Sequence, residues 1–209
     1  MWVLWLLLLF QITSSGNSES SVFMIRNYSF EDGPVGCCQT PPEWVNCGAM
    51  EETPPDIHCN QCKNAFGVQM KAPHGKQFLA LVVRSNGTKE CLQQELSRPL
   101  LPDSIYRLQL FLGRSAVFNS MDRNTNEAAS YASLADLKIY GMTESGFVKE
   151  LSVIRPFTGA DWTEYSVLIK PEKEIDVLIF EAGYLGRQDT EVYNGHILLD
   201  YIRLELVSG

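Results

Sequence analysis

Hydrophobic and polar side chains alternate along much of the chain after residue 65, and this period of two predicts β-strands. In Ser104–Leu112, for example, the side chains of Tyr106, Leu108, Leu110 and Leu112 would all face the same side. Turn-forming combinations such as Ser-Asn-Gly, Asn-Gly and proline separate the runs. The expected strands are Val22–Ile25, Phe66–Met70, Gln77–Val83, Cys91–Leu96, Ser104–Leu112, Ser133–Tyr140, Val148–Ile154, Glu164–Lys170, Ile175–Ala182 and His196–Val207.

Short strands at this spacing are typical of a β-sandwich or jelly roll, and no convincing helical period or internal repeat interrupts them. The chain has 209 residues, and the 45% that are hydrophobic are too many for a disordered protein. We therefore expect an all-β, jelly-roll β-sandwich of about nine or ten strands. It should form a single domain over residues 16–209, with a cysteine-rich loop insert over residues 32–64 near its N-terminus.

The first residues differ from the rest. Trp2–Phe10 is an uncharged apolar run, and small polar residues follow it at 13–16. This run is much shorter than the roughly 20 residues that a membrane-spanning helix needs. It is typical of a signal peptide, although no lysine or arginine precedes it. We expect residues 1–15 to be removed and the mature chain, which has no second apolar span, to be secreted or held at the cell surface without membrane insertion.

Cysteine usage agrees with an exported protein. An even number of cysteines in such a chain predicts disulfide bonds, but six cysteines leave 15 complete pairings open. Because Cys37 and Cys38 are neighbours, we expect each to take a separate partner. The Cys59-x-x-Cys62 spacing also suits zinc, but it has no well-spaced second pair. The expected disulfide cysteines are Cys37, Cys38, Cys47, Cys59, Cys62 and Cys91.

The net charge of −8 and the lack of a basic cluster exclude nucleic acid as a partner. Catalytic patterns are also missing. Glu174 and Glu181 are seven residues apart and would face opposite sides of a regular strand, so they cannot form the carboxyl pair of a glycosidase. No Gly-x-Ser-x-Gly motif occurs. We expect no catalytic residues.

Several segments resemble one family in order and spacing. Asn27-Tyr-Ser-Phe-Glu31 resembles the N-terminal signature of galactose-binding-domain-like jelly rolls, a superfamily that includes many carbohydrate-binding modules. Ile197–Leu204, with Asp200, resembles the C-terminal strand that pairs with it. Gly75–Leu81 and Asp161–Tyr165 are similar to the family's intervening strands. A further set resembles a subgroup found in exported Bacteroidetes-type surface proteins: Pro41–Gly48, Pro54–His58 and Leu112–Ser115.

This resemblance implies a structural calcium ion that ties the first strand to the last. Glu31 and Asp200 would supply side-chain oxygens, and a carbonyl near Lys76 would be a third ligand. Calcium prefers such hard oxygen ligands, usually six to eight of them. Alternatively, both carboxylates are solvated strand ends. The second acidic residue that often follows the late aspartate is replaced here by Tyr201.

Sugar recognition uses aromatic faces together with amide, carboxylate and guanidinium groups. The chain offers these groups in three long connections, at residues 32–64, 113–132 and 183–195, which could converge at one end of a sandwich. Each aromatic residue could equally pack in the core. The candidate ligand-binding residues are Trp44, Arg114, Tyr131, Tyr184, Tyr193 and Asn194.

The sequence therefore predicts a secreted, non-catalytic carbohydrate-binding module that takes a glycan or polysaccharide and is supported by calcium. The alternative is an extracellular adhesive domain that binds a cell-surface protein, and an enzyme acting on polysaccharide is a weaker third reading. Two N-glycosylation sequons start at Asn27 and Asn86. Asn86 lies in an expected turn and would be accessible, whereas Asn27 lies in the calcium-strand motif.

Overall fold

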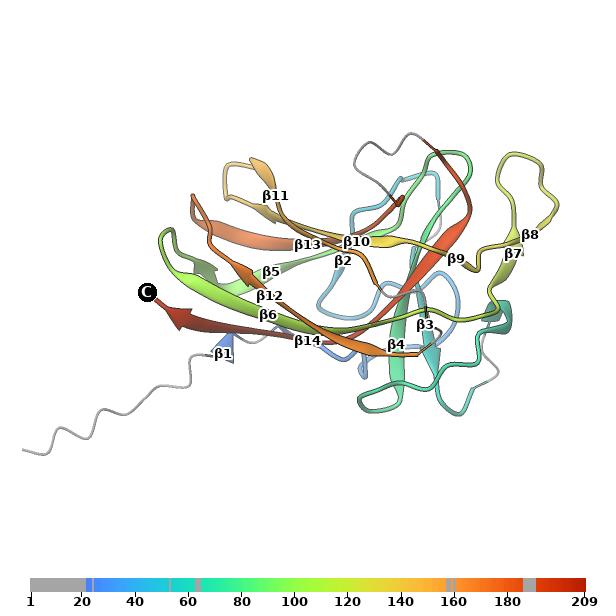
Figure 1. Cartoon of the computed structure of the whole chain (residues 1–209), viewed down its shortest axis with the longest axis horizontal. Coiled ribbons are helices and arrows are strands. Elements are labelled where there is room, and N and C mark those ends of the chain that lie inside the picture. Colours follow the sequence, from blue (N-terminus) through green and yellow to red (C-terminus); the bar gives the residue numbers. More distant parts are fainter. Residues whose placement is uncertain are drawn as a thin grey trace, which may run out of the picture.

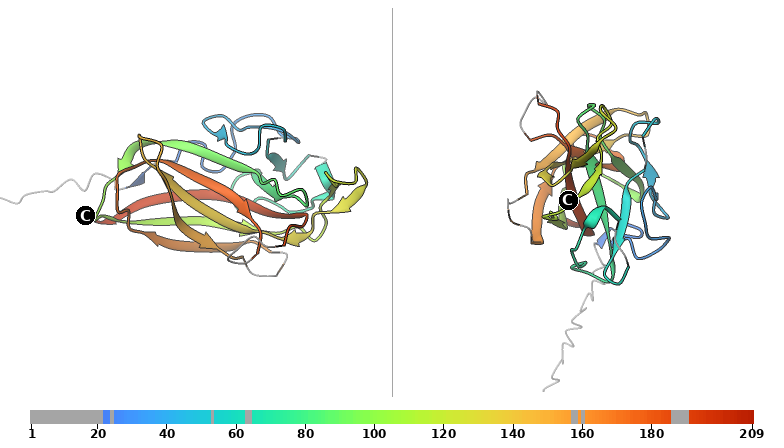
Figure 2. Two further views of the ribbon diagram at one scale, coloured as in Figure 1. Left: turned by 90° about the horizontal axis from the view of Figure 1, so that it is seen from above. Right: turned by 90° about the vertical axis from the view of Figure 1, so that its right-hand side faces the viewer.

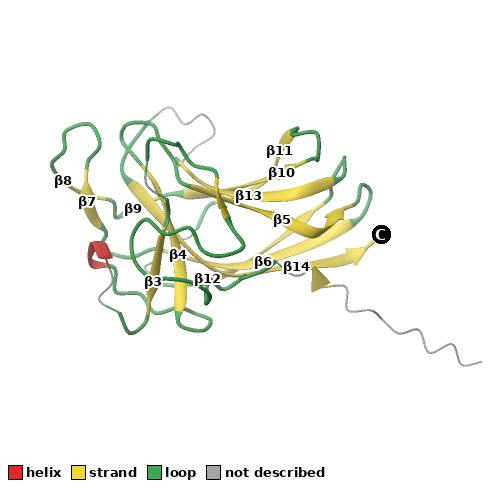
Figure 3. Ribbon diagram, turned by 180° about the vertical axis from the view of Figure 1, so that it is seen from behind, coloured by secondary structure: helices red, strands yellow, loops and turns green. Residues whose placement is uncertain are grey.

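The computed structural model describes residues 22–23, 25–52, 54–62, 65–156, 159, 161–185 and 191–209. The expected signal peptide at residues 1–15 lies outside these residues. Among the described residues, strands form two large sheets that face each other and one separate hairpin (Figure 1). The one short helical turn is a 3₁₀ segment, η1 (Ala65–Gly67), and no described helix is long and apolar enough to cross a membrane (Figure 3).

The seven-stranded sheet is antiparallel except at one short edge contact. Its order is β12 (Thr163–Ile169), β6 (Ile105–Gly113), β14 (Gly195–Ser208), β4 (Gln77–Val83) and β3 (Asp56–Cys59), and β1 (Val22–Phe23) and β9 (Ser133–Leu134) also pair with β14. Only β9 runs parallel to β14. The central strand β14 therefore pairs with four other strands and links both halves of the sheet.

The five-stranded sheet covers the other side of the core. Its order is β11 (Val148–Ile154), β10 (Asp136–Met142), β13 (Ile175–Gly183), β5 (Cys91–Leu100) and β2 (Val45–Asn46). The remaining hairpin, β7 (Asn119–Met121) and β8 (Ala128–Ser130), extends from the end of the sandwich opposite the C-terminus (Figures 1 and 2).

The expected alternation is confirmed in β6, where Tyr106, Leu108, Leu110 and Leu112 are buried between the sheets. In β4 both faces are buried. Leu79, Leu81 and Val83 belong to the main core, whereas Phe78, Ala80 and Val82 form a second cluster with Val68, Phe118 and Tyr131. This second cluster, which we call the outer cluster, includes residues of η1, the segment after it and the β7–β8 hairpin.

One expected strand is wrong. Residues Phe66–Met70 form no strand, because Phe66 and Gly67 both have positive φ angles, 61° and 78°, which end any extended conformation. The apolar side chains that suggested a strand pack on the outer cluster instead. Their burial explains the hydrophobic pattern without any backbone pairing.

Two disulfide bonds cross-link the N-terminal half. Cys47–Cys91 joins the end of β2 to the start of β5, and Cys59–Cys62 closes the turn after β3. The expectation that Cys37 and Cys38 are bridged is wrong: both are exposed and lie outside the two bridges. The other four cysteines pair among themselves, and adjacent Cα atoms, about 3.8 Å apart, are too close for an ordinary disulfide between neighbours.

Candidate functional site

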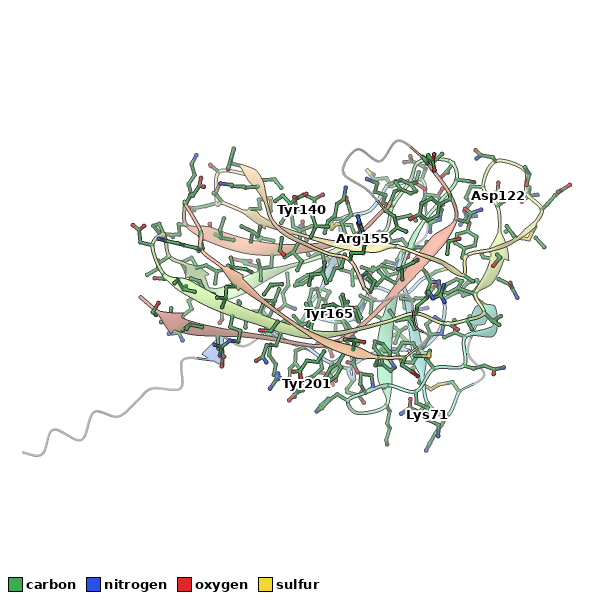
Figure 4. All side chains as sticks on the ribbon, viewed as in Figure 1. Lys71, Asp122, Tyr140, Arg155, Tyr165 and Tyr201 are labelled. Atoms are coloured by element: carbon green, nitrogen blue, oxygen red, sulfur yellow. A yellow bond between two sulfur atoms is a disulfide. The ribbon has the colours of Figure 1, made fainter. Side chains whose placement is uncertain are left out.

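Described residues of the three long connections meet near the β7–β8 hairpin, where Asp122 and Arg123 contact Asn194 and Glu52. Asp122, on this hairpin, is the centre of the junction (Figure 4). Its Oδ2 accepts hydrogen bonds from Ser85 Oγ and from Asn194 Nδ2, both at 2.6 Å. Arg123 forms an ion pair with Glu52 at 2.9 Å. The hydrogen bonds from Ser85 and Asn194 hold the pKa of Asp122 well below its usual range, so this residue stays ionised and fastens the loops together.

Next to this junction is a pocket of about 200 Å³, which we call the loop-end pocket. It lies on the outer side of β3 and β4, under the β7–β8 hairpin, with η1 at another wall. Its walls combine apolar and charged side chains, the mixture that is typical of small-molecule sites. The main contributors are Phe66, Phe118, Met121, Asp56, Arg84 and Arg123.

The apolar wall of the pocket is held in place by ring contacts and one hydrogen bond. The ring of Phe66 stacks on that of Phe118, with centroids 5.1 Å apart and planes 5° from parallel. Tyr131 is buried, and its hydroxyl donates to the carbonyl oxygen of Met121 at 2.9 Å. The side chain of Met121 is 44% exposed at the rim. The pocket therefore presents a preformed apolar surface to solvent.

The floor of the pocket contains a buried ion-pair network. Arg84, directly after β4, contacts the carboxylate of Glu90 and lies 3.5 Å from that of Glu52. The second Glu90 oxygen accepts a hydrogen bond from Val82 N at 3.0 Å. Burial raises the pKa of Glu90 well above its ordinary value, and Arg84 opposes that shift. The network anchors the turn that leads from β4 to β5.

Asp56 is the remaining carboxylate of the pocket. It is only 5% exposed, and its Oδ1 accepts a hydrogen bond from Cys38 N at 3.1 Å. Burial raises its pKa to about 6. Among the described residues, no cationic side chain lies within ion-pair distance of it. A buried carboxyl group with a raised pKa at the wall of a pocket is a recognised sign of a functional site.

Three of the aromatic residues expected to bind a ligand are buried. Trp44, Tyr131 and Tyr184 are 5%, 2% and 1% exposed, so their rings cannot stack on a sugar, and this expectation is corrected. Trp44 packs on the rings of Phe30 and Phe180 in the core. Large amphipathic side chains in long loops are covered by those loops while their polar atoms still find partners. Only Tyr131 borders the pocket, as part of its wall.

The other three expected residues hold loops rather than line the pocket. Arg114 Nη1 donates to the carbonyl oxygen of Ala132 at 3.2 Å. The Tyr193 hydroxyl donates to the carbonyl oxygen of Leu134 at 2.8 Å. Asn194 bonds to Asp122 in the loop junction. All three are half-buried, and each uses at least one polar side-chain atom in a bond within the fold.

The pocket residues Asp56, Phe66, Arg84 and Glu90 escaped the sequence analysis. One signal was present: Arg84 and Glu90 flank the Ser-Asn-Gly turn, Arg84 directly after the apolar run 78–83 and Glu90 directly before the next expected strand. Opposite charges in such positions are typical of a buried pair across a tight connection. Asp56 carried no comparable signal, because its proline-rich surroundings predict only a loop.

A second site joins the N-terminal loop to the last strand, as the resemblance implied. The Glu31 Oε1 atom accepts hydrogen bonds from the amides of Lys76 and Gln77, both at 2.7 Å. The turn comes close to this carboxylate, since a Cβ atom on Gly75 would lie 2.3 Å from Glu31 Oε1. Gly75 also has a φ of +65°, which favours glycine. The Lys76 carbonyl oxygen accepts a hydrogen bond from Asn60 N at 2.9 Å.

The Asp200 side of this second site is fully buried. The two carboxylate oxygens accept hydrogen bonds from His74 N at 3.1 Å and Tyr201 N at 2.7 Å. Burial raises the pKa of Asp200 to about 7, and the negative charge of Glu31 adds to the rise. Tyr201 has a φ of 54° at an irregularity in β14, which turns Asp200 toward the loop. We call this pair of carboxylates the Glu31–Asp200 junction.

The two sequons lie in different surroundings. Asn86 is exposed in the turn between β4 and β5, where its amide nitrogen donates to Glu52 Oε1 at 2.8 Å. Asn27 is half-buried, and its amide nitrogen donates to the carbonyl oxygens of Asp32 and Pro42. A glycan on Asn27 would disturb both of these bonds at a half-buried position, whereas one on Asn86 would disturb only the Glu52 bond at an exposed turn.

No protein-family model matches this chain, and no curated protein matches its sequence. Solved structures do share its fold. The K2 cleaved adhesin domain of Lys-gingipain matches with a TM-score of 0.53 at 12% identity, over 92% of this chain and 99% of that domain. The CBM22-1 xylan-binding domain from Paenibacillus barcinonensis Xyn10C matches with a TM-score of 0.50 at 15% identity, over 87% and 93% of the two chains. The predicted resemblance to carbohydrate-binding jelly rolls is thus confirmed at the level of the fold.

Proposed function

We propose that this protein is an exported, non-catalytic carbohydrate-binding domain and that the loop-end pocket holds its sugar. The observation that carries this proposal is the composition of the pocket, where Phe66 and Met121 form an apolar surface beside the buried carboxylate of Asp56. Apolar and aromatic faces bind the C–H side of a pyranose, while carboxylate and guanidinium groups bind its hydroxyls. The fold supports the proposal, since one similar structure is a xylan-binding domain.

The size of the pocket indicates which part of a glycan it holds. Pockets for drug-sized ligands enclose about 300–1,000 Å³. At about 200 Å³ the loop-end pocket has room for a single sugar unit rather than an extended chain. Such a site suits the end of a glycan or a branch, because the hairpin and η1 close two of its sides.

The test is binding to a broad glycan array, followed by titration of the best ligand. Arg123→Ala is expected to lower affinity at least about tenfold, because it removes a guanidinium from the pocket wall. Arg203→Ala is the matched control, since both arginines are about two-fifths exposed and form one ion pair with a glutamate. Met121→Asp is a second pocket variant at an exposed position, which keeps the test independent of folding.

Two results would contradict the proposal. One is an array on which the folded protein binds no glycan, which would favour the adhesive alternative with a protein partner. The other is glycan binding that Arg123→Ala and Met121→Asp leave unchanged, which would place the sugar elsewhere. Thermal melts of each variant show whether the fold is intact.

We further propose that a calcium ion occupies the Glu31–Asp200 junction. The fit rests on charge: two carboxylates approach each other there, one of them fully buried, and Glu31 Oε2 accepts no hydrogen bond from the described residues. In the described part of the chain, no group of three His, Cys, Asp or Glu residues is placed to hold a metal. The other ligands would therefore be carbonyl or hydroxyl oxygens and water. The ion would neutralise both carboxylates and fasten the loop after Phe30 to β14.

Removal of calcium is expected to lower the melting temperature. A ligand present at about 100 times its dissociation constant stabilises a fold by about 2.7 kcal/mol, which is roughly 5–10 °C for a domain of this size. Melting curves with calcium and with chelator measure the difference. Glu31→Gln should abolish it, because the amide oxygen can still accept the Lys76 and Gln77 bonds but carries no charge. Equal melting temperatures with and without calcium would overturn this proposal.

A further inference from the structure

The charges around the loop-end pocket do not balance. Three carboxylates, those of Glu52, Asp56 and Glu90, meet two guanidinium groups, those of Arg84 and Arg123. Arg84 contacts Glu90 and Glu52, and Arg123 contacts Glu52. Asp56 is the carboxylate left over. When every group is ionised, the site therefore carries one negative charge in excess, located at Asp56.

The position of Asp56 makes this excess available to a ligand. The side chain borders the pocket, and the residue is about 95% buried, since only 5% of its surface is exposed. The amide of Cys38 bonds to Oδ1, whereas Oδ2 accepts no hydrogen bond from the residues that the structure describes. The charge of Arg84 lowers the pKa of Asp56, but Arg84 forms its ion pairs with Glu52 and Glu90, so the desolvation of the Asp56 carboxylate is only partly offset. A cationic group on a ligand would supply the missing partner.

Resting on the proposed function, we infer that the loop-end pocket selects a sugar that carries a protonated amino group, whose ammonium pairs with Asp56. A 2-amino-2-deoxyhexose at the end of a glycan has this chemistry. Its ammonium would reach Asp56 while its C–H face packs on the apolar wall formed by Phe66 and Met121. An acidic sugar is disfavoured, because both arginines already have carboxylate partners and Asp56 would repel it.

Binding of such a sugar is linked to the protonation of Asp56. The charged and titratable groups that face it are Cys38 in the loop before β2, Arg84 after β4, Glu90 before β5, and Arg123 and Tyr131 from the hairpin region. With a pKa of about 6, Asp56 is half-protonated at pH 6 in the free protein. A bound ammonium lowers that pKa, so binding at pH 6 should release about half a proton. Affinity should rise between pH 5 and pH 7 for the same reason.

Titration calorimetry with the methyl glycosides of glucosamine, glucose, N-acetylglucosamine and glucuronic acid tests this inference. At pH 6, where the amine is protonated, glucosamine is expected to bind at least about tenfold more tightly than the other three. Two buffers with different ionisation enthalpies report the released proton. Asp56→Asn should abolish both the preference and the proton release while its amide oxygen still accepts the Cys38 bond. Asp136→Asn, at an equally buried aspartate outside the pocket, is the control.

The outcomes separate the two proposals. If glucose or N-acetylglucosamine binds in the pocket as tightly as glucosamine, the inference is overturned and the carbohydrate-binding function stands. A glucosamine preference that survives Asp56→Asn would also overturn it. If none of these glycosides binds and the glycan array is blank as well, the proposed function itself fails.

Discussion

Replacing Arg84 with leucine is expected to lower the free energy of unfolding by about 3–5 kcal/mol, because it leaves a buried carboxylate without its counter-ion. The side chains of Arg84 and Glu90 are both only 3% exposed, so water cannot take over the role of the guanidinium. Glu52 would lose one of its two arginine partners as well. Urea unfolding of the variant and of the wild-type protein measures the difference.

The stability lost in Arg84→Leu should be smaller at low pH. In the variant, Glu90 would enter the folded state protonated, since burial raises its pKa and Arg84 no longer opposes the rise. A carboxyl group whose pKa is raised in the folded state stabilises that state at low pH, where it is protonated. As the pH rises above its pKa in the unfolded chain, near 4.3, the free energy of unfolding falls. Each unit of pH below 7 should therefore recover up to about 1.4 kcal/mol.

Arg107→Leu is the matched control for this variant. Arg107 also pairs with a glutamate, Glu205 at 2.6 Å, but its side chain is 41% exposed, so its loss should cost less than about 1 kcal/mol. If Arg84→Leu costs no more than Arg107→Leu, the network does not anchor the β4–β5 turn. A loss that stays constant between pH 7 and pH 5 would show that Glu90 does not protonate.

Removing the Cys47–Cys91 bridge with alanines is the second large effect, an expected loss of about 4 kcal/mol. The bridge spans a sequence separation of 44, and a cross-link over that length removes much entropy from the unfolded chain. The same relation gives only about 2 kcal/mol for Cys59–Cys62, whose separation is 3. The two double-alanine variants thus serve as controls for each other in denaturant unfolding.

The exposed thiols need attention in this experiment. A thiolate at Cys37 or Cys38 can attack a disulfide, so both should be serine in every variant to prevent exchange. With that background fixed, equal losses from the two bridges would contradict the loop-length argument. It would then follow that native contacts near the bridges, rather than chain entropy, set their contribution.

The sequence predicted the strands well because each strand carries its signal locally. β4 has the same bounds as the expected run, Gln77–Val83, even though both of its faces are buried. Phe66–Met70 shows the limit of this reasoning: an apolar run also arises when an irregular segment packs on a sheet. Only the positive φ angles distinguish the two cases, and hydrophobic patterning does not report them.

The candidate site was harder to predict because its residues meet only in the folded chain. Whether Trp44 or Tyr184 is buried depends on which distant segments of the chain pack over its ring. The sequence around each residue is the same in either case, so it does not reveal the burial. Asp56 and Arg123 face one pocket from positions 67 residues apart (123 − 56). By contrast, the family resemblance placed Glu31 and Asp200 together. The family motif relates the first strand to the last, and composition alone carries no information about such a long-range pairing.

The central place of β14 has a consequence for the order in which the protein folds. β14 lies between β6 and β4, and it follows all the other strands that the structure describes. During synthesis, β4 and β6 therefore emerge without the strand that must separate them, and the strand edges that pair with β14 stay unpaired until residues 195–208 arrive. Such non-local pairing slows folding and leaves strand edges open to wrong partners. The seven-stranded sheet is assembled around its last strand, so its folding waits for the end of this sequence.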